Sequence, residues 1–125
     1  MKIGSFSAAS NVTGILSDTG AISTLLHRHG ALSFWDFAAA APYVDIDMRS
    51  ADPATRKDAV VLSPHKFIGG PGTPGVLVIR RELLTNRVPD VVGGGTVAYV
   101  NPDEHVYLDD PVAPERAGQH FRRAV

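Results

Sequence analysis

A short apolar run, Ala59–Leu62, constrains the fold of this chain more than any other feature of its sequence. A continuous run that is rich in β-branched residues is typical of a strand covered on both faces, as in a parallel sheet. Similar apolar runs at residues 2–8, 31–35 and 76–79 are also predicted to be strands. The chain is therefore expected to form a sheet of at least four short strands.

The segment between the first two runs is predicted to be a helix over residues 19–29. Four of its residues recur with the spacing of one helix face, namely Ile22, Leu25, Leu26 and His29. The stretch Ser17-Asp18-Thr19 offers a candidate N-cap, and Gly30 is a natural residue to end the helix. Alternation of strands and helix favours an α/β fold, with a mostly parallel sheet and flanking helices.

Two further segments have weaker signals. Apolar and polar residues alternate over residues 44–48, which predicts one more short strand. Residues 80–84 are expected to form a helical turn. After Val88 the pattern weakens, and a glycine triplet with several prolines predicts a loop-rich segment over residues 91–125. Both ends of the sequence read as cut, so we expect a fragment of a longer protein.

Charge and composition exclude several classes of protein. Lys and Arg total 12 against 13 Asp and Glu, which gives no support to nucleic acid or an anionic membrane as a partner. The chain has no cysteine, so it has no disulfide, no cysteine-bound zinc and no thiol nucleophile. No apolar run approaches the length of a membrane-spanning helix, and no signal peptide is recognisable. A globular, cytoplasmic protein is expected.

Polar residues follow three of the predicted strands. Asn11 comes after the first strand, Asp36 ends the second, and Ser63, His65 and Lys66 follow the run at 59–62. The carboxyl ends of parallel strands meet at one edge of a sheet, where ligands bind in open α/β folds. We therefore expect these residues to converge on one site. The five histidines form no metal-binding motif, so no metal site is expected.

The residue types alone leave the roles of these side chains open. Lys66 is either a nucleophile with a lowered pKa or an ordinary surface lysine. Asp36 is either a charged ligand group or the cap of a helix in the alanine run that follows it. Ser63 and His65 could bind a phosphate group, beside a loop at 69–75 whose glycines permit close approach of a ligand.

Taken together, these motifs resemble the class V aminotransferase family. They are Ser-Asn-Val-Thr-Gly at residues 10–14, Asp36, and Ser-x-His-Lys at residues 63–66 followed by the glycine-rich loop. Asn11 and Asp36 are 25 residues apart, and Asp36 and Lys66 are 30 apart. The family comprises fold-type I enzymes that depend on pyridoxal phosphate, including the cysteine desulfurases.

The resemblance implies a role for each motif residue. Lys66 would form a Schiff base with pyridoxal phosphate, and Asp36 would pair with the pyridine nitrogen. Ser63 and His65 would hold the phosphate, and Asn11 would lie near the ring hydroxyl and the substrate carboxylate. Ala39 stands where family members often have Gln.

The resemblance also implies the setting of these residues. Residues 1–90 would be part of the large, cofactor-binding domain, and residues 91–125 would lead toward a C-terminal domain. The complete enzyme would be a homodimer acting on an amino acid by transamination, desulfuration or a related cleavage. The alternatives are a catalytically inactive remnant and an unrelated phosphate-binding module.

Overall fold

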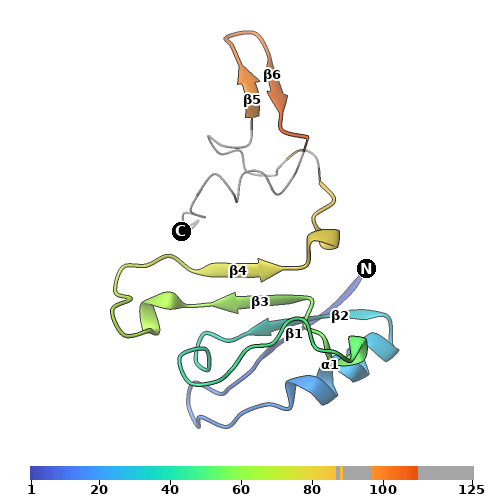
Figure 1. Ribbon diagram of the computed structural model, residues 1–125, viewed down its shortest axis with the longest axis vertical. Coiled ribbons are helices and arrows are strands. Elements are labelled where there is room, and N and C mark those ends of the chain that lie inside the picture. Colours follow the sequence, from blue (N-terminus) through green and yellow to red (C-terminus); the bar gives the residue numbers. More distant parts are fainter. Residues whose placement is uncertain (87, 89–96, 110–125) are drawn as a thin grey trace. The chain divides into compact units, whose positions relative to one another are not determined.

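The computed structural model describes residues 1–86, 88 and 97–109 (Figure 1). The chain divides into a first unit of residues 1–79 and a second unit that begins at Arg80. Each unit is described by itself. No helix in the described ranges is both long enough and apolar enough to cross a membrane.

A four-stranded sheet forms the first unit, and its strands are adjacent in chain order. The strands are β1 (Lys2–Ser7), β2 (Ala31–Asp36), β3 (Ala59–Leu62) and β4 (Val76–Ile79). β1 pairs with β2 and β2 with β3 in parallel, whereas β4 runs antiparallel to β3. In Figure 1 the arrow of β4 points opposite to those of β2 and β3. The prediction of an α/β fold with a mostly parallel sheet is confirmed.

The helix α1 (Thr19–Arg28) connects β1 to β2, as predicted, and ends one residue earlier than expected. Asp18 Oδ1 accepts a hydrogen bond from the Ala21 amide at 2.9 Å, which satisfies a free donor of the first turn. Gly30 has a φ of 66°, a left-handed conformation that ends the helix and that glycine adopts without strain. Local sequence therefore sets both ends of this helix.

Close packing holds α1 against the sheet. A Cβ atom added at Gly4 of β1 would lie 2.8 Å from Leu26 Cδ1, so the glycine leaves room for this side chain of the helix to pack on the strand. Trp35 of β2 is 1% exposed, and its indole Nε1 donates to Ser23 Oγ of the helix at 3.0 Å. The largest core side chain thereby has its one polar atom satisfied without contact with water.

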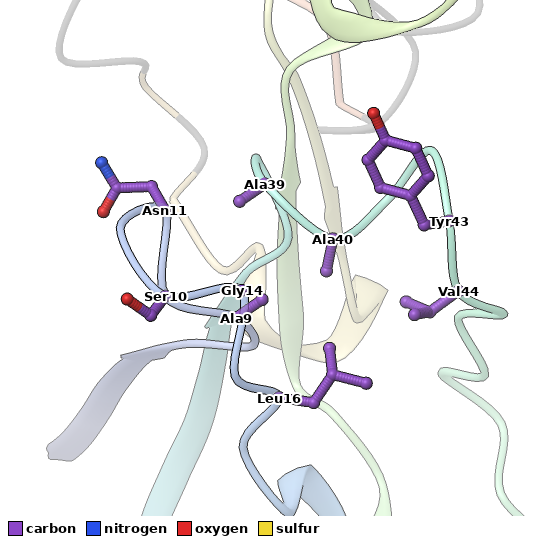
Figure 2. A pocket seen from close by; sticks show the side chains of 9 residues that line it. All are labelled: Ala9, Ser10, Asn11, Gly14, Leu16, Ala39, Ala40, Tyr43 and Val44. Carbon is purple, nitrogen blue, oxygen red and sulfur yellow. The ribbon is translucent and has the colours of Figure 1, made fainter.

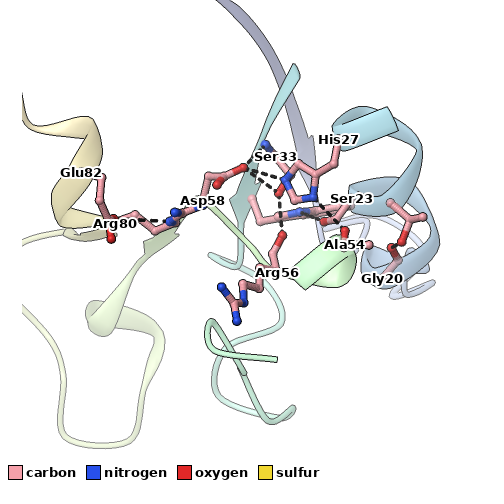
Figure 3. A network of polar contacts seen from close by, with 11 residues as sticks. Gly20, Ser23, His27, Ser33, Ala54, Arg56, Asp58, Arg80 and Glu82 are labelled. Atoms are coloured by element: carbon pink, nitrogen blue, oxygen red, sulfur yellow. Dashed lines mark hydrogen bonds and ion pairs between the residues drawn. The ribbon is translucent and has the colours of Figure 1, made fainter. Parts of the chain in front are cut away.

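A buried polar network joins α1 to the starts of β2 and β3 (Figure 3). Asp58 is 1% exposed, and its Oδ2 accepts hydrogen bonds from the Ser33 amide at 2.8 Å and from His27 Nε2 at 2.9 Å. The Asp58 amide donates in return to the Ser33 carbonyl at 2.9 Å. His27 Nδ1 lies 2.8 Å from the carbonyl oxygen of Ala54, in the 3₁₀ turn η1 (Pro53–Thr55). The Asp58 carboxylate and the Ala54 carbonyl can both accept from His27 only when each nitrogen of its ring carries a proton.

Two predictions for this unit are wrong. Residues 44–48 do not form a strand: the turn after β2 extends to Val44, whose amide donates to the Ala40 carbonyl at 3.2 Å, and the residues that follow it are irregular. The run 59–62 is not covered on both faces, because Val61 is 44% exposed while Val60 is 1% exposed. Val60 is paired with Trp35 and shares the face that α1 covers.

The second unit contains a 3₁₀ turn and a hairpin in its described residues. The turn η3 (Arg81–Leu83) confirms the helical turn expected at residues 80–84. Strands β5 (Val97–Val100) and β6 (His105–Tyr107) pair in antiparallel orientation, a hairpin that the sequence did not predict. Of the segment predicted to be loop-rich, residues 91–96 and 110–125 lie outside the described residues.

The hydrogen bond between Trp35 and Ser23 leads to a stability prediction. Ser23→Ala should lower the free energy of unfolding by about 1–3 kcal/mol, because the buried indole N–H loses its acceptor. Thr24→Ala is the matched control: the Thr24 hydroxyl donates to the Gly20 carbonyl of its own helix, so its loss leaves no buried donor unpaired. Urea unfolding of both variants measures the difference. Equal destabilisation would show that the Trp35 contact contributes nothing specific.

Candidate functional site

The register of the parallel strands brings the predicted site residues to one edge of the sheet. Ser7 of β1 pairs with Asp36 of β2, and Asp36 pairs with Val61 of β3, so the three strands end side by side. Asn11 follows four residues after Ser7, and the segment 63–66 begins two residues after Val61. The chain therefore leaves the sheet three times at the same edge, each time with a polar residue of the predicted site.

Hydrogen bonds on both sides fix the backbone at Asp36. Its carbonyl accepts from the Ala8 amide at 2.8 Å, and the next amide, of Phe37, donates to the Val61 carbonyl at 2.9 Å. Asp36 Oδ1 accepts from the Ala38 amide at 2.7 Å. A turn and not a helix follows, so the alternative that Asp36 caps a helix is wrong. The carboxylate is exposed, and in the described part of the chain its Oδ2 has no hydrogen-bond partner.

Lys66 is the last residue of η2 (Pro64–Lys66), a 3₁₀ helix of one turn. The turn is closed by hydrogen bonds from the Lys66 amide to the Ser63 carbonyl at 3.0 Å and from the Phe67 amide to the Pro64 carbonyl at 2.9 Å. The side chains of His65 and Lys66 are exposed, and neither has an ion pair or hydrogen bond among the described residues. Ser63 is half-buried, and its hydroxyl does not cap the turn.

The glycine-rich loop packs against this turn. Gly70 is buried, and a Cβ atom added there would collide with the Pro64 carbonyl oxygen and lie 2.9 Å from its carbon. Thr73 closes the loop by donating from Oγ1 to the Gly70 carbonyl at 2.7 Å. The absence of a side chain at Gly70 thus lets the loop support the turn that carries Lys66.

The loop after β1 is held by its own backbone and by Ser10. Ser10 Oγ accepts from the amides of Val12 at 3.2 Å and Thr13 at 3.1 Å, and the Ser10 carbonyl accepts from the Gly14 amide at 2.9 Å. Asn11 lies at the tip of this loop with its side chain exposed, and among the described residues its amide has no partner. The backbone is thereby ordered while the Asn11 amide stays available.

A cavity of about 420 Å³ lies between the loop after β1 and the turns after β2 (Figure 2). Its lining is mostly small and apolar and consists of Ala9, Ser10, Asn11, Gly14, Leu16, Ala39, Ala40, Tyr43 and Val44. Of these residues, only Asn11 is predicted from the sequence to belong to the site. The cavity is lined by two segments that are about 30 residues apart in the chain, so no local sequence pattern predicts it.

These groups suit a ligand with several functional groups. The edge offers a carboxylate, an ammonium, an imidazole, a hydroxyl and an amide, which are the partners for a protonated ring nitrogen, an aldehyde and a phosphate. Pyridoxal phosphate carries all three, so the donor set fits it. In the described ranges no cluster of three or more His, Asp or Glu side chains is placed to hold a metal ion.

Residues 1–118 match the sequence profile of the family described as aminotransferase class-V. Over 124 residues, the chain is 33% identical to a cysteine desulfurase of Synechococcus elongatus and 36% identical to a probable cysteine desulfurase of Staphylococcus epidermidis. These alignments cover 99% of this chain, but 19% and 29% of the two relatives. The chain thus spans less than a third of their length.

A crystal structure of the cysteine desulfurase CsdA from Escherichia coli has the same arrangement. It superposes on 88% of this chain with a TM-score of 0.72 and 30% sequence identity. The apo structure of a cysteine desulfurase from Thermococcus onnurineus gives a TM-score of 0.69 at 26% identity. In each case the match covers 26% of the solved chain.

The contact between Gly70 and Pro64 generates a prediction for the site. Gly70→Ala should lower the free energy of unfolding by about 1–3 kcal/mol and shift the amide resonances of His65 and Lys66, because a Cβ atom displaces the turn. Gly75→Ala is the control, since its Cβ atom would lie an ordinary 3.6 Å from the Leu62 carbonyl. Denaturant unfolding and amide NMR spectra test both. Unchanged His65 and Lys66 resonances in Gly70→Ala would refute the supporting role of the loop.

Proposed function

Because this chain belongs to the class V aminotransferase family, we propose that it forms part of the pyridoxal-phosphate site of an enzyme that acts on an amino acid. The observation that supports this most is the shared sheet edge, where β1, β2 and β3 end beside one another and lead to Asn11, Asp36 and Lys66. Pyridoxal phosphate, when bound, supplies an electron sink for the carbon that bears the substrate's amino group.

Lys66 is proposed to attach the cofactor through its ε-amino group and later to carry a proton to or from the substrate's α-carbon. Its side chain is exposed and has no ion-pair partner in the described residues, so no neighbouring carboxylate competes for it. The tight turn η2 holds its backbone. A fixed backbone with a free amino group is what a positioned nucleophile requires.

Asp36 is proposed to accept a hydrogen bond from the protonated ring nitrogen of the cofactor. Its Oδ1 is engaged by the Ala38 amide, which fixes the carboxylate and leaves Oδ2 for the ligand. A negative charge at this place favours the protonated form of a nearby ring nitrogen. The carboxylate would thus hold a proton on the ring nitrogen of the bound cofactor.

The remaining residues are proposed to bind the anionic groups. Ser63 and His65 hold the phosphate by hydrogen bonds from a hydroxyl and an imidazole. The Asn11 amide donates to the ring hydroxyl and to the substrate carboxylate. Three further parts of the proposal rest on the family resemblance: residues 1–90 as part of the large domain, residues 91–125 as the start of a connection to a C-terminal domain, and a homodimer. A cytoplasmic location is proposed because the sequence has no recognisable signal peptide.

Reduction with borohydride identifies the lysine that carries the cofactor. The chain has three lysines, and we expect the pyridoxyl group on Lys66. Lys57 is 8% exposed and donates to the Asp47 carbonyl at 3.1 Å, whereas Lys2 is exposed at the start of β1. Mass spectrometry of peptides after incubation with pyridoxal phosphate reads out the label. Lys66→Arg should abolish it and Lys2→Arg should retain it.

The outcome separates the proposal from its alternatives. Labelling of Lys2 in preference to Lys66 would contradict the assignment. Phosphate binding at Ser63 and His65 without any label would favour a phosphate-binding module. A label on Lys66 with no turnover of any amino acid would indicate an inactive remnant.

The role of Asp36 can be tested with cofactor labelled with ¹⁵N at its ring nitrogen. The ¹⁵N chemical shift should report a protonated nitrogen in the wild type and an unprotonated one in Asp36→Asn, because the amide has no negative charge to retain the proton. Loss of a hydrogen bond between charged groups should also weaken cofactor binding about tenfold or more. Asp45→Asn, an exposed carboxylate on the following segment, is the control. An identical shift in Asp36→Asn and wild type would rule this role out.

A further inference from the structure

The cavity between the loop after β1 and the turns after β2 is placed to select the substrate. We propose that it is the subsite for the substrate's side chain, and that it takes an amino acid with a branched aliphatic or aromatic side chain. This inference rests on the proposed function. The inference adds the class of amino acid to the proposed function, because the motif residues alone do not indicate which amino acid is bound.

The walls of the cavity are mostly apolar, and Ser10, Asn11 and Tyr43 add uncharged polar groups. Leu16, Ala39, Ala40 and Val44 face it, and none of its lining residues is charged. An apolar group that enters loses contact with water and gains contact with these side chains. A carboxylate or ammonium group would lose part of its hydration and find no opposite charge among the lining residues. The lining therefore favours hydrocarbon over charged side chains.

Small residues keep the cavity open, and backbone hydrogen bonds keep its floor in place. Ala40 is 3% exposed; its amide donates to the Phe37 carbonyl at 3.1 Å and its carbonyl accepts from Val44. Gly14 on the other wall has a φ of 72°, a conformation that residues with side chains rarely adopt. The volume of about 420 Å³ lies in the range of small-molecule sites and exceeds what a small side chain needs.

The position of the cavity relates it to the proposed reaction. Figure 2 shows Asn11 on one side and Tyr43 on the other, with Ala39 and Ala40 between them. Asn11 is the proposed partner of the substrate carboxylate, and Ala39 comes three residues after Asp36. An amino acid bound through its carboxylate at Asn11 would thus have an apolar cavity beside it for its side chain.

Methyl NMR of the full 125-residue chain tests the subsite directly. With ¹³C-labelled alanine, leucine and valine methyl groups, L-phenylalanine and L-leucine should cause saturable shifts of Leu16, Ala39, Ala40 and Val44. L-Aspartate should bind about tenfold more weakly or more, because a site of this kind discriminates by at least that factor. Absence of saturable shifts with both apolar amino acids, or equal binding of aspartate, would overturn the inference.

Two pairs of variants locate the binding. Ala39→Gln places a larger polar side chain in the cavity and should weaken phenylalanine binding about tenfold, whereas Ala38→Gln, beside it but outside the lining, should not. Because Ala39 packs against the core, a larger side chain there can also disturb folding. A second pair of variants is therefore made at exposed residues. Tyr43 is 83% exposed, and Tyr43→Ser should weaken binding severalfold, unlike Ile68→Ser at a fully exposed residue outside the lining.

The binding experiment fails separately from the proposed function. If Lys66 accepts the pyridoxyl label but phenylalanine and leucine do not bind, only the assignment of the side-chain subsite is wrong. If the apolar amino acids bind and Lys66 stays unlabelled, the cavity is an amino-acid site of another kind and the proposed function fails. Loss of binding in Ala38→Gln or Ile68→Ser to the same extent as in the cavity variants would place the amino acid elsewhere and overturn the inference.

Discussion

The reciprocal pairing of Asp58 with Ser33 is the interaction on which the rest of the first unit depends. The side chain of Asp58 accepts from the Ser33 amide, and its own amide donates to the Ser33 carbonyl. A buried carboxylate is costly unless donors surround it, so the sheet is stable only in the register that supplies them. That register sets Asp36 beside Val61 and so determines where the chain toward Lys66 leaves the sheet.

The same network ties the helix to the sheet and leaves the opposite face of the sheet open. His27 reaches Asp58 from α1, Ser23 satisfies Trp35, and Gly4 lets Leu26 approach β1. On the other face Val61 and its partner Leu77 are 44% and 47% exposed. The closely packed part of the first unit is therefore the helix-covered face of the sheet, and the polar edge adjoins it.

At that edge, ordered backbone carries side chains that are free to bind a ligand. Ser10 closes the loop of Asn11, Gly70 supports the turn of Lys66, and the neighbouring strands hold Asp36 on both sides. The amide of Asn11, Oδ2 of Asp36 and the amino group of Lys66 have no partners among the described residues. Preorganised backbone with unengaged polar groups costs a ligand little reorganisation, which is the usual condition for a binding site.

The sequence by itself determined the elements whose signals are local. Asp18 and Gly30 mark the two ends of the helix, and the apolar runs mark four strands. Asn11, Asp36 and Lys66 lie at or after the ends of three of these strands, which places them at one edge of the sheet. Only the tertiary structure decided the antiparallel direction of β4, the irregular backbone in place of a strand at residues 44–48, and the cavity between Asn11 and Tyr43. Helix capping and hydrophobic periodicity depend on residues close together in the chain, so they can be recognised in the sequence. Strand direction and cavities depend on contacts between distant segments, and their free energies appear only when those segments are packed together.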